Sequence, residues 1–248
     1  MNPKAITRTT QTTSTRREPD MTITATKLTR ASGVAAAVSG LIFIGVQIKH
    51  PHLDVTSITT NDVVVRSSLK LLMAALGLVG ITGIYLRQVK KMGVLGLVGY
   101  VLLSAGYLGI ACTEFIAAFV LPTLVHTAPA YVADLIAAAN NGTAIGDIGW
   151  MQTAILLTGF GYLVGGLSFG IALFRANVLA RWAALLLAVG TAATAATGMV
   201  PQYERLFPIP VGVALIGLGY SLWNEQRTRA GQSSPISVSP QLRPAGAK

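Results

Sequence analysis

Charged residues are scarce in this chain. Only 11% of its 248 residues are Asp, Glu, Lys or Arg, whereas about 25% is usual in soluble domains. So few charges cannot cover a water-facing surface. The hydrophobic residues make up 52% of the chain and gather in runs of membrane-spanning length. The composition therefore excludes a soluble globular domain and predicts an integral membrane protein whose main partner is the lipid bilayer.

Cysteine and intramembrane histidine are also lacking. Cys112 is the only cysteine, which excludes an intramolecular disulfide framework, a CxxC redox pair and an iron–sulfur cluster. We expect it to be a small buried apolar residue. His50, His52 and His126 lie between apolar runs, so no haem is held between two transmembrane histidines. They are weak candidates for a metal site, because no recognised ligand spacing connects them. We favour no metal and expect no cofactor.

Motifs of several enzyme classes are missing as well. The chain has no phosphate-binding Gly-Lys-Ser/Thr motif, no HExxH motif and no GxSxG motif. No segment between the apolar runs is long enough to form a nucleotide-binding domain, so this chain alone cannot drive transport with ATP. No apolar run carries a ladder of arginines, which argues against voltage sensing.

Six apolar runs are present instead. Backbone polar groups in lipid must be satisfied within their own segment, so each run is expected to be a helix. The predicted fold class is all-α, a polytopic six-transmembrane-helix bundle. The expected spans are 31–48, 69–86, 93–121, 149–174, 182–200 and 209–223. The polar segments 1–30 and 224–248 are expected to be disordered tails.

The basic residues lie unevenly around these runs. The net charge is +10, and 15 of the 19 Lys and Arg residues belong to the two tails and to the loops on the same side as the tails. The positive-inside rule then places both termini in the cytoplasm of a multi-pass plasma-membrane protein. Anionic lipid headgroups at the cytoplasmic face are a candidate partner, and nucleic acid is not expected to be one.

The longest connection, residues 122–147, is predicted to lie on the outer side. It contains a helical pattern that starts at Pro129 and extends over 129–140. Its apolar face comprises Tyr131, Val132, Leu135, Ile136 and Ala139. We expect an amphipathic helix on the outer membrane surface. A lid over an outward-facing pocket is the alternative.

Small residues recur at helical spacing in the fourth and fifth runs. They are Gly161, Gly165, Gly166, Gly170, Gly190, Thr194 and Gly198. Small side chains let helix backbones approach closely. We therefore expect close packing inside one bundle, and a homo-oligomer interface remains an open alternative.

Glu114 is the only acidic residue inside an expected span, and an ionisable group there is costly enough to indicate a role. Tyr100, Ser104 and Tyr107 precede it at intervals that share one face of a helix. Lys70 enters the second expected span near the same membrane side, so a Lys70–Glu114 ion pair is expected. These five residues are the candidate binding residues.

Three functions fit this pattern. The favoured one is binding or transport of a small solute or cation at an outward-facing site in the bundle near Glu114. An integral membrane enzyme acting on a lipid or isoprenoid is an alternative, with Glu114 as general acid or base and Tyr107 assisting. No second intramembrane carboxylate supports that enzyme. The third is a structural or accessory subunit, which a dry core around the ion pair would favour.

Two stretches carry a family resemblance. RSSLKLLMAALGLVGITGIYLRQ (66–88) and LFRANVLARWAALLL (173–187) resemble segments of small, uncharacterised actinobacterial integral membrane proteins. The resemblance implies a bacterial cytoplasmic membrane. It implies no activity and no catalytic residue.

Overall fold

The computed structural model describes residues 24–48, 53–140, 142–195 and 206–232. In the last of these segments, side chains are described only as far as residue 225. Its elements, in chain order, are α1 (Ala25–Gly45), the 3₁₀ turn η1 (Ser57–Thr59), α2 (Asn61–Phe119), α3 (Leu121–Leu124), α4 (Pro129–Ala139), α5 (Met151–Ala176), α6 (Arg181–Ala193) and α7 (Ile209–Gln232). No strand occurs in these segments. The predicted all-α fold class is confirmed.

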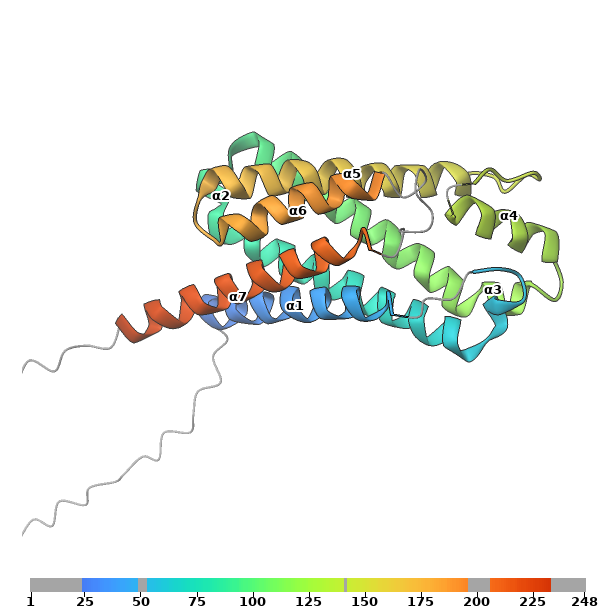
Figure 1. The fold of residues 1–248 in the computed structure, drawn as a ribbon, viewed down its shortest axis with the longest axis horizontal. Helices are drawn as coiled ribbons and strands as arrows, with labels where there is room; N and C mark the ends of the chain where they lie inside the picture. The colour runs from blue at the N-terminus through green and yellow to red at the C-terminus, as the bar shows by residue number, and fades with distance from the viewer. Residues whose placement is uncertain (1–23, 49–52, 141, 196–205, 233–248) are drawn as a thin grey trace, which may run out of the picture.

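The long helix α2 reverses direction at Gly93. That residue has φ 58° and ψ −161°, a conformation essentially restricted to glycine. It divides α2 into a first arm, 61–92, and a second arm, 94–119. The arms lie antiparallel (Figure 1), and the rings of Tyr85 and Tyr100 stack with their centroids 4.5 Å apart. The two arms correspond to the expected helices 69–86 and 93–121, with shifted ends.

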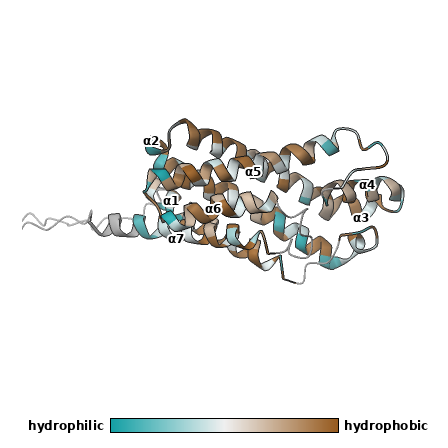
Figure 2. Ribbon diagram, turned by 45° about the horizontal axis from the view of Figure 1, so that its top comes forward, coloured by the Kyte–Doolittle hydropathy of each residue, from teal (hydrophilic) through white to brown (hydrophobic). Residues whose placement is uncertain are grey.

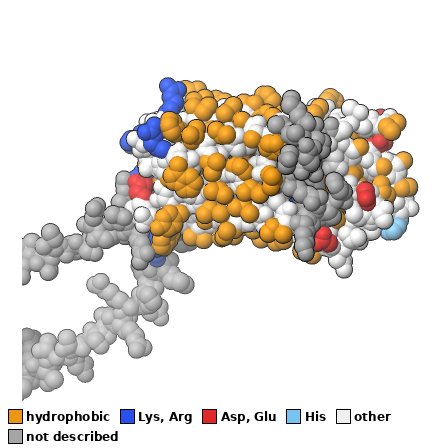
Figure 3. Space-filling view, in the orientation of Figure 1, with side chains coloured by type: hydrophobic (Ala, Val, Ile, Leu, Met, Phe, Trp, Pro, Cys, Tyr) orange, Lys and Arg blue, Asp and Glu red, His pale blue; other side chains and the backbone are white. Residues whose placement is uncertain are grey.

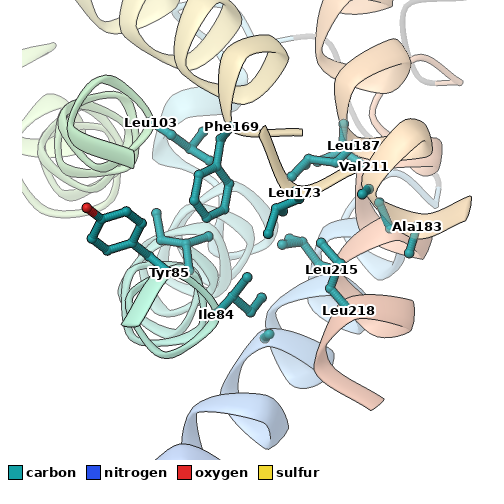
Figure 4. Packing of buried hydrophobic residues seen from close by; sticks show 14 of the residues in the cluster. Ile84, Tyr85, Leu103, Phe169, Leu173, Ala183, Leu187, Val211, Leu215 and Leu218 are labelled. Atoms are coloured by element: carbon teal, nitrogen blue, oxygen red, sulfur yellow. The ribbon is translucent and has the colours of Figure 1, made fainter. Parts of the chain in front are cut away.

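The helices pack as a closed ring around one core. α1 lies between α2 and α7, α5 lies between α2 and α6, and α6 contacts α7. Figure 4 shows the side chains that fill the centre, where α5, α6 and α7 meet the two arms of α2. The largest of them are buried, including Phe169, Leu173, Leu187, Leu215 and Leu218. The start of α1 and the described end of α7 lie at the same end of this bundle (Figure 1).

Glycines set the close approach of α5 to its two neighbours. A Cβ atom at Gly161 would lie 3.0 Å from the carbonyl oxygen of Leu102 in the second arm of α2. On the opposite face, a Cβ atom at Gly170 would lie 2.9 Å from the Cα atom of Ala188 in α6. Packing inside one bundle is thus confirmed at these glycines, while Gly198 lies outside the described residues.

Apolar side chains dominate the outside of the bundle. Figure 2 shows hydrophobic residues along the middle of the helices and hydrophilic ones mainly towards their ends. Leu86, Val94 and Leu157 are 62%, 77% and 64% exposed, which is typical of surface that faces lipid. Among the described helices, α1, α2 and α5 are long and apolar enough to cross a membrane. The chain is therefore a membrane protein.

Several expected boundaries are corrected. α1 begins at Ala25, where the Thr24 hydroxyl accepts a hydrogen bond from the Lys27 N–H, so 25–30 is helical. α7 continues to Gln232, beyond the expected end at 223. In both places the apolar pattern marks only the lipid-facing part, and polar residues of good helix propensity extend the helix. The rest of both expected tails lies outside the described residues, as does 196–200 of the expected span 182–200.

The expected helix over 129–140 is confirmed as α4, and the structure shows what packs against its apolar face. Val132, Leu135 and Ile136 are buried in a second apolar cluster with Ile58 of η1 and Leu121 of α3. Protein, instead of the membrane surface, covers the apolar face of α4. The pattern shows that a helix has an apolar face, but it cannot show what covers that face.

Candidate functional site

An ion pair joins the two arms of α2. The Nζ atom of Lys70 lies 3.2 Å from Oε1 of Glu114, and the two side chains are 24% and 18% exposed. Lys70 belongs to the first arm and Glu114 to the second, so the reversal at Gly93 brings together residues 44 positions apart in the sequence. The ion pair expected from the sequence is confirmed.

This pair lies in the wall of a cavity of about 280 Å³. The cavity is near the end of the bundle that carries α3 and α4, and Leu53 and Ala139 form part of its wall. Its polar lining consists of Arg66, Ser67, Lys70, Thr113, Glu114 and Thr158. The pair is therefore reachable by a small solute, unlike a pair enclosed in a dry core.

Arg66 contributes a second positive charge that is already engaged. Its guanidinium donates to Oδ2 of Asp62 at 2.9 Å and to the carbonyl oxygen of Ile48 at 2.9 Å. The second contact satisfies a carbonyl just beyond the end of α1, where orphan carbonyl groups attract cations. Arg66 thus ties α1 to α2, and Asp62 balances its charge. The ion pair of Lys70 with Glu114 is balanced in the same way.

The hydroxyls in the cavity wall keep acceptor capacity. Thr113 donates to the carbonyl oxygen of Ile110 at 3.0 Å, and Thr158 donates to that of Ala154 at 2.8 Å. Each hydroxyl therefore uses its proton within its own helix and retains lone pairs. Ser67, Thr113 and Thr158 were not expected in this site. Ser67 and Thr113 are close in sequence to Lys70 and Glu114, but only the packing of α5 against α2 shows that Thr158 lines the same cavity.

The other candidate binding residues do not line the cavity. The Tyr100 hydroxyl lies 3.0 Å from that of Thr82. Tyr107 is fully buried and packs edge-on against Tyr162, with ring centroids 6.0 Å apart. The side-chain oxygens of Ser104, Tyr107 and Tyr162 have no hydrogen-bond partner among the described residues. The expected stripe does face the bundle, but it is not one site with Glu114, and Tyr107 is too deep to assist it.

The structure also bears on the histidines, which were weak candidates for a metal site, and on Cys112, which was expected to be buried. His50 and His52 lie outside the described residues, and His126 is exposed. Within the described segments, no group of three or more His, Cys, Asp or Glu side chains is placed to hold a metal ion. Cys112, expected to be buried, is exposed, because it lies on the outward-facing side of the second arm.

Comparisons with protein-family models, with curated proteins and with solved structures gave no match.

Proposed function

We propose that the chain is a multi-pass protein of a bacterial plasma membrane that binds or transports a small solute in the cavity beside Glu114. The observation that carries this proposal is the position of the Lys70–Glu114 pair in a cavity wall. A charged pair inside a membrane protein is costly, and such groups usually mark a ligand or ion pathway. A purely structural pair has no need of the space beside it.

The proposed topology has six membrane spans: α1, both arms of α2, α5, α6 and α7. The start of α1 and the described end of α7 lie at one end of the bundle, where Lys and Arg side chains gather (Figure 3). The positive-inside rule assigns that end to the cytoplasm. The cavity is nearer the opposite end and would open outward.

The charges favour a solute with both a donor and an acceptor over a lone cation. A cation at Glu114 would have to displace Lys70 and leave its ammonium group unpaired, which is costly in a partly buried site. A zwitterion can enter between the two groups, with its carboxylate on Lys70 and its ammonium on Glu114. The apolar wall, including Ala117 and Ile155, would receive an aliphatic side chain.

The remaining alternatives receive less support. Among the described residues, Glu114 is the only carboxylate in the lining of this cavity, and the buried Tyr107 does not belong to that lining. An acid–base enzyme that works with two carboxylates would need a second one, which the described cavity wall does not supply. An accessory subunit is the outcome to expect if no solute occupies the cavity.

The ligand class is tested with three probes of similar size. Leucine, isoamylamine and 4-methylpentanoate share one aliphatic group and carry both charges, only the positive charge or only the negative charge. We expect leucine to raise the melting temperature of the purified protein most, since a ligand at 100 times its Kd adds about 2.7 kcal/mol of stability. Glu114→Gln should abolish this gain.

The control is Asp147→Asn, which removes a carboxylate that accepts the Gly149 N–H at 2.8 Å and lies outside the described cavity lining. It should leave the leucine effect unchanged. An equal effect of isoamylamine would make this a cation site and contradict the proposed ligand class. No effect of any probe would favour the structural role of the pair.

A further inference from the structure

A second cleft, of about 540 Å³, lies at the opposite end of the bundle from Glu114. It is formed by the last turns of the first arm of α2, by the turn between α5 and α6, and by α7. Its polar lining consists of Arg87, Gln88, Lys90, Lys91, Asn177 and Glu225. Three basic side chains face one carboxylate in this set, so the cleft carries net positive charge.

One wall of the cleft is held rigidly. The guanidinium of Arg87 forms two parallel hydrogen bonds to the carboxylate of Glu225, one of them from Nε to Oε2 at 3.0 Å. Bidentate pairs of this kind are strong and geometrically specific. The pair joins α2 to α7 and neutralises Arg87. The positive charge that remains in the cleft therefore comes from Lys90 and Lys91.

These two lysines are available to a ligand. Both are exposed, and no carboxylate among the described residues pairs with either of them. Each ammonium group has three donors, which suit the oxygens of a phosphate group. Their position at the end of an apolar helix is where lipid phosphates lie beside a membrane protein.

The neighbouring Gln88 has a side-chain oxygen that can accept a hydrogen bond from a ligand. It is only 2% exposed, and its Oε1 atom has no hydrogen-bond partner among the described residues. Its amide nitrogen approaches the carbonyl oxygen of Ile84 at 3.5 Å. A buried acceptor without a donor is unfavourable. A ligand that carries a hydroxyl or ammonium donor next to its phosphate would satisfy it.

An apolar groove adjoins this cleft at Leu86. Leu86 belongs to the lining of both. The groove has a volume of about 320 Å³ and runs between α1 and the first arm of α2, past Leu28, Leu78, Val79 and Thr82. From residue 86 to residue 78 a helix rises about 12 Å. A free phosphate would leave this groove unused, whereas an acyl chain would cover it.

We propose that the cleft and the groove together bind one anionic glycerophospholipid. Its phosphate group contacts Lys90 and Lys91, a headgroup hydroxyl donates to Gln88, and one acyl chain lies in the groove beside Leu86 and Val79. Phosphatidylglycerol has this combination of a single negative charge, free hydroxyl groups and acyl chains. This site shares no lining residue with the Glu114 cavity. A test of lipid binding here is therefore independent of the proposed solute binding.

The test measures lipid binding to the full chain purified in detergent. Phosphatidylglycerol, phosphatidylcholine with the same acyl chains, and inorganic phosphate are titrated separately, and bound lipid is counted by native mass spectrometry. We expect one tightly bound phosphatidylglycerol, and little retention of phosphatidylcholine. Lys90→Gln and Lys91→Gln should each weaken phosphatidylglycerol binding about fivefold, since a basic residue near a lipid surface contributes about 1 kcal/mol.

Three further variants make the test specific. Gln88→Met removes the buried acceptor at similar size and should reduce the preference for phosphatidylglycerol over phosphatidic acid, which lacks the headgroup hydroxyls. Val79→Trp should fill the groove and lower binding of both lipids. Arg175→Gln removes an exposed charge that lies at the same end but outside the cleft lining, and it should have little effect.

Several results would overturn the proposal. An equal loss in Arg175→Gln would show diffuse attraction to the charged surface instead of a site. Equal retention of phosphatidylcholine would show no recognition of charge. Full competition by inorganic phosphate at millimolar concentration would assign the cleft to a soluble anion. Melting temperatures of the lipid-free variants, expected to match the wild type for Lys90→Gln and Lys91→Gln, separate these effects from misfolding.

Discussion

At the scale of single residues, Lys70 and Glu114 are the groups whose placement needs an energetic explanation. Both side chains are less than one quarter exposed, so each depends on the other to offset the cost of leaving water. The same residues line the Glu114 cavity, which means that a ligand would compete with their mutual attraction. Stability and binding are therefore coupled at this pair.

A double-mutant cycle tests this coupling. Lys70→Met and Glu114→Gln should each destabilise the protein by about 1–3 kcal/mol, because each leaves one partly buried charged group without its partner. The double variant should lose less than the sum of the two, by at least about 0.5 kcal/mol. The free energy of unfolding in detergent is measured for the wild type, the two single variants and the double variant. Additive losses would mean that the two groups do not stabilise each other. Arg175→Met, at an exposed residue, is the control for loss of a positive charge.

At the scale of the elements, the reversal of α2 at Gly93 makes its two arms antiparallel and so places Lys70 and Glu114 together in the wall of the Glu114 cavity. No atom lies within 4 Å of a Cβ added at Gly93, so the requirement for glycine there comes from the backbone alone. The positive φ of 58° strains any residue with a side chain. Sequence periodicity predicted two separate helices, and only the structure shows how tightly the chain turns between them.

Gly93→Ala should therefore destabilise the protein by about 1–3 kcal/mol. The matched control is Gly159→Ala, where an added Cβ atom also meets no atom within 4 Å but the backbone is helical. That variant should be neutral or more stable by up to about 1 kcal/mol. Both are compared by thermal unfolding in detergent. If the two variants have equal stability, the turn at Gly93 does not need a positive φ.

At the scale of the whole molecule, the two ends of the bundle differ in chemistry. Lys and Arg gather at the end where α1 starts, and the middle is covered with hydrophobic side chains (Figure 3). The other end carries α3 and α4 over a second apolar cluster. This asymmetry is the reason for proposing that the cleft lined by Lys90 and Lys91 and the Glu114 cavity lie on opposite sides of the membrane.

Cysteine labelling in intact cells tests this orientation. In a Cys112→Ser background, His126→Cys and Arg175→Cys each add one thiol at an exposed residue near opposite ends of the bundle. A membrane-impermeant maleimide should label His126→Cys from outside, and Arg175→Cys only after the cells are opened. The reverse pattern would invert the topology. Labelling of both from outside would exclude a membrane barrier between them.

Much of the fold was predictable because it depends on local composition. Apolar runs in lipid must be helical, so the all-α class, the two arms of α2 and the helix α4 follow from the sequence. The ion pair was predictable too, because Glu114 and Lys70 are rare charges at the same level of neighbouring helices. The glycine spacing in α5 likewise predicted close packing. The helices and the glycine spacing depend on residue type and periodicity, and the ion pair depends in addition on the two arms being adjacent.

The sequence by itself determined that the apolar segments are helices and which charges lie among them. Only the tertiary structure decided that the Lys70–Glu114 pair borders a cavity, that Thr158 of α5 faces it, and that protein covers the apolar face of α4. It alone decided that Gln88 is buried in the wall of the cleft lined by Lys90 and Lys91, and that a groove sharing Leu86 lies next to that cleft. The physical reason is that cavities and clefts arise where helices distant in sequence pack incompletely, and no local pattern records that mismatch.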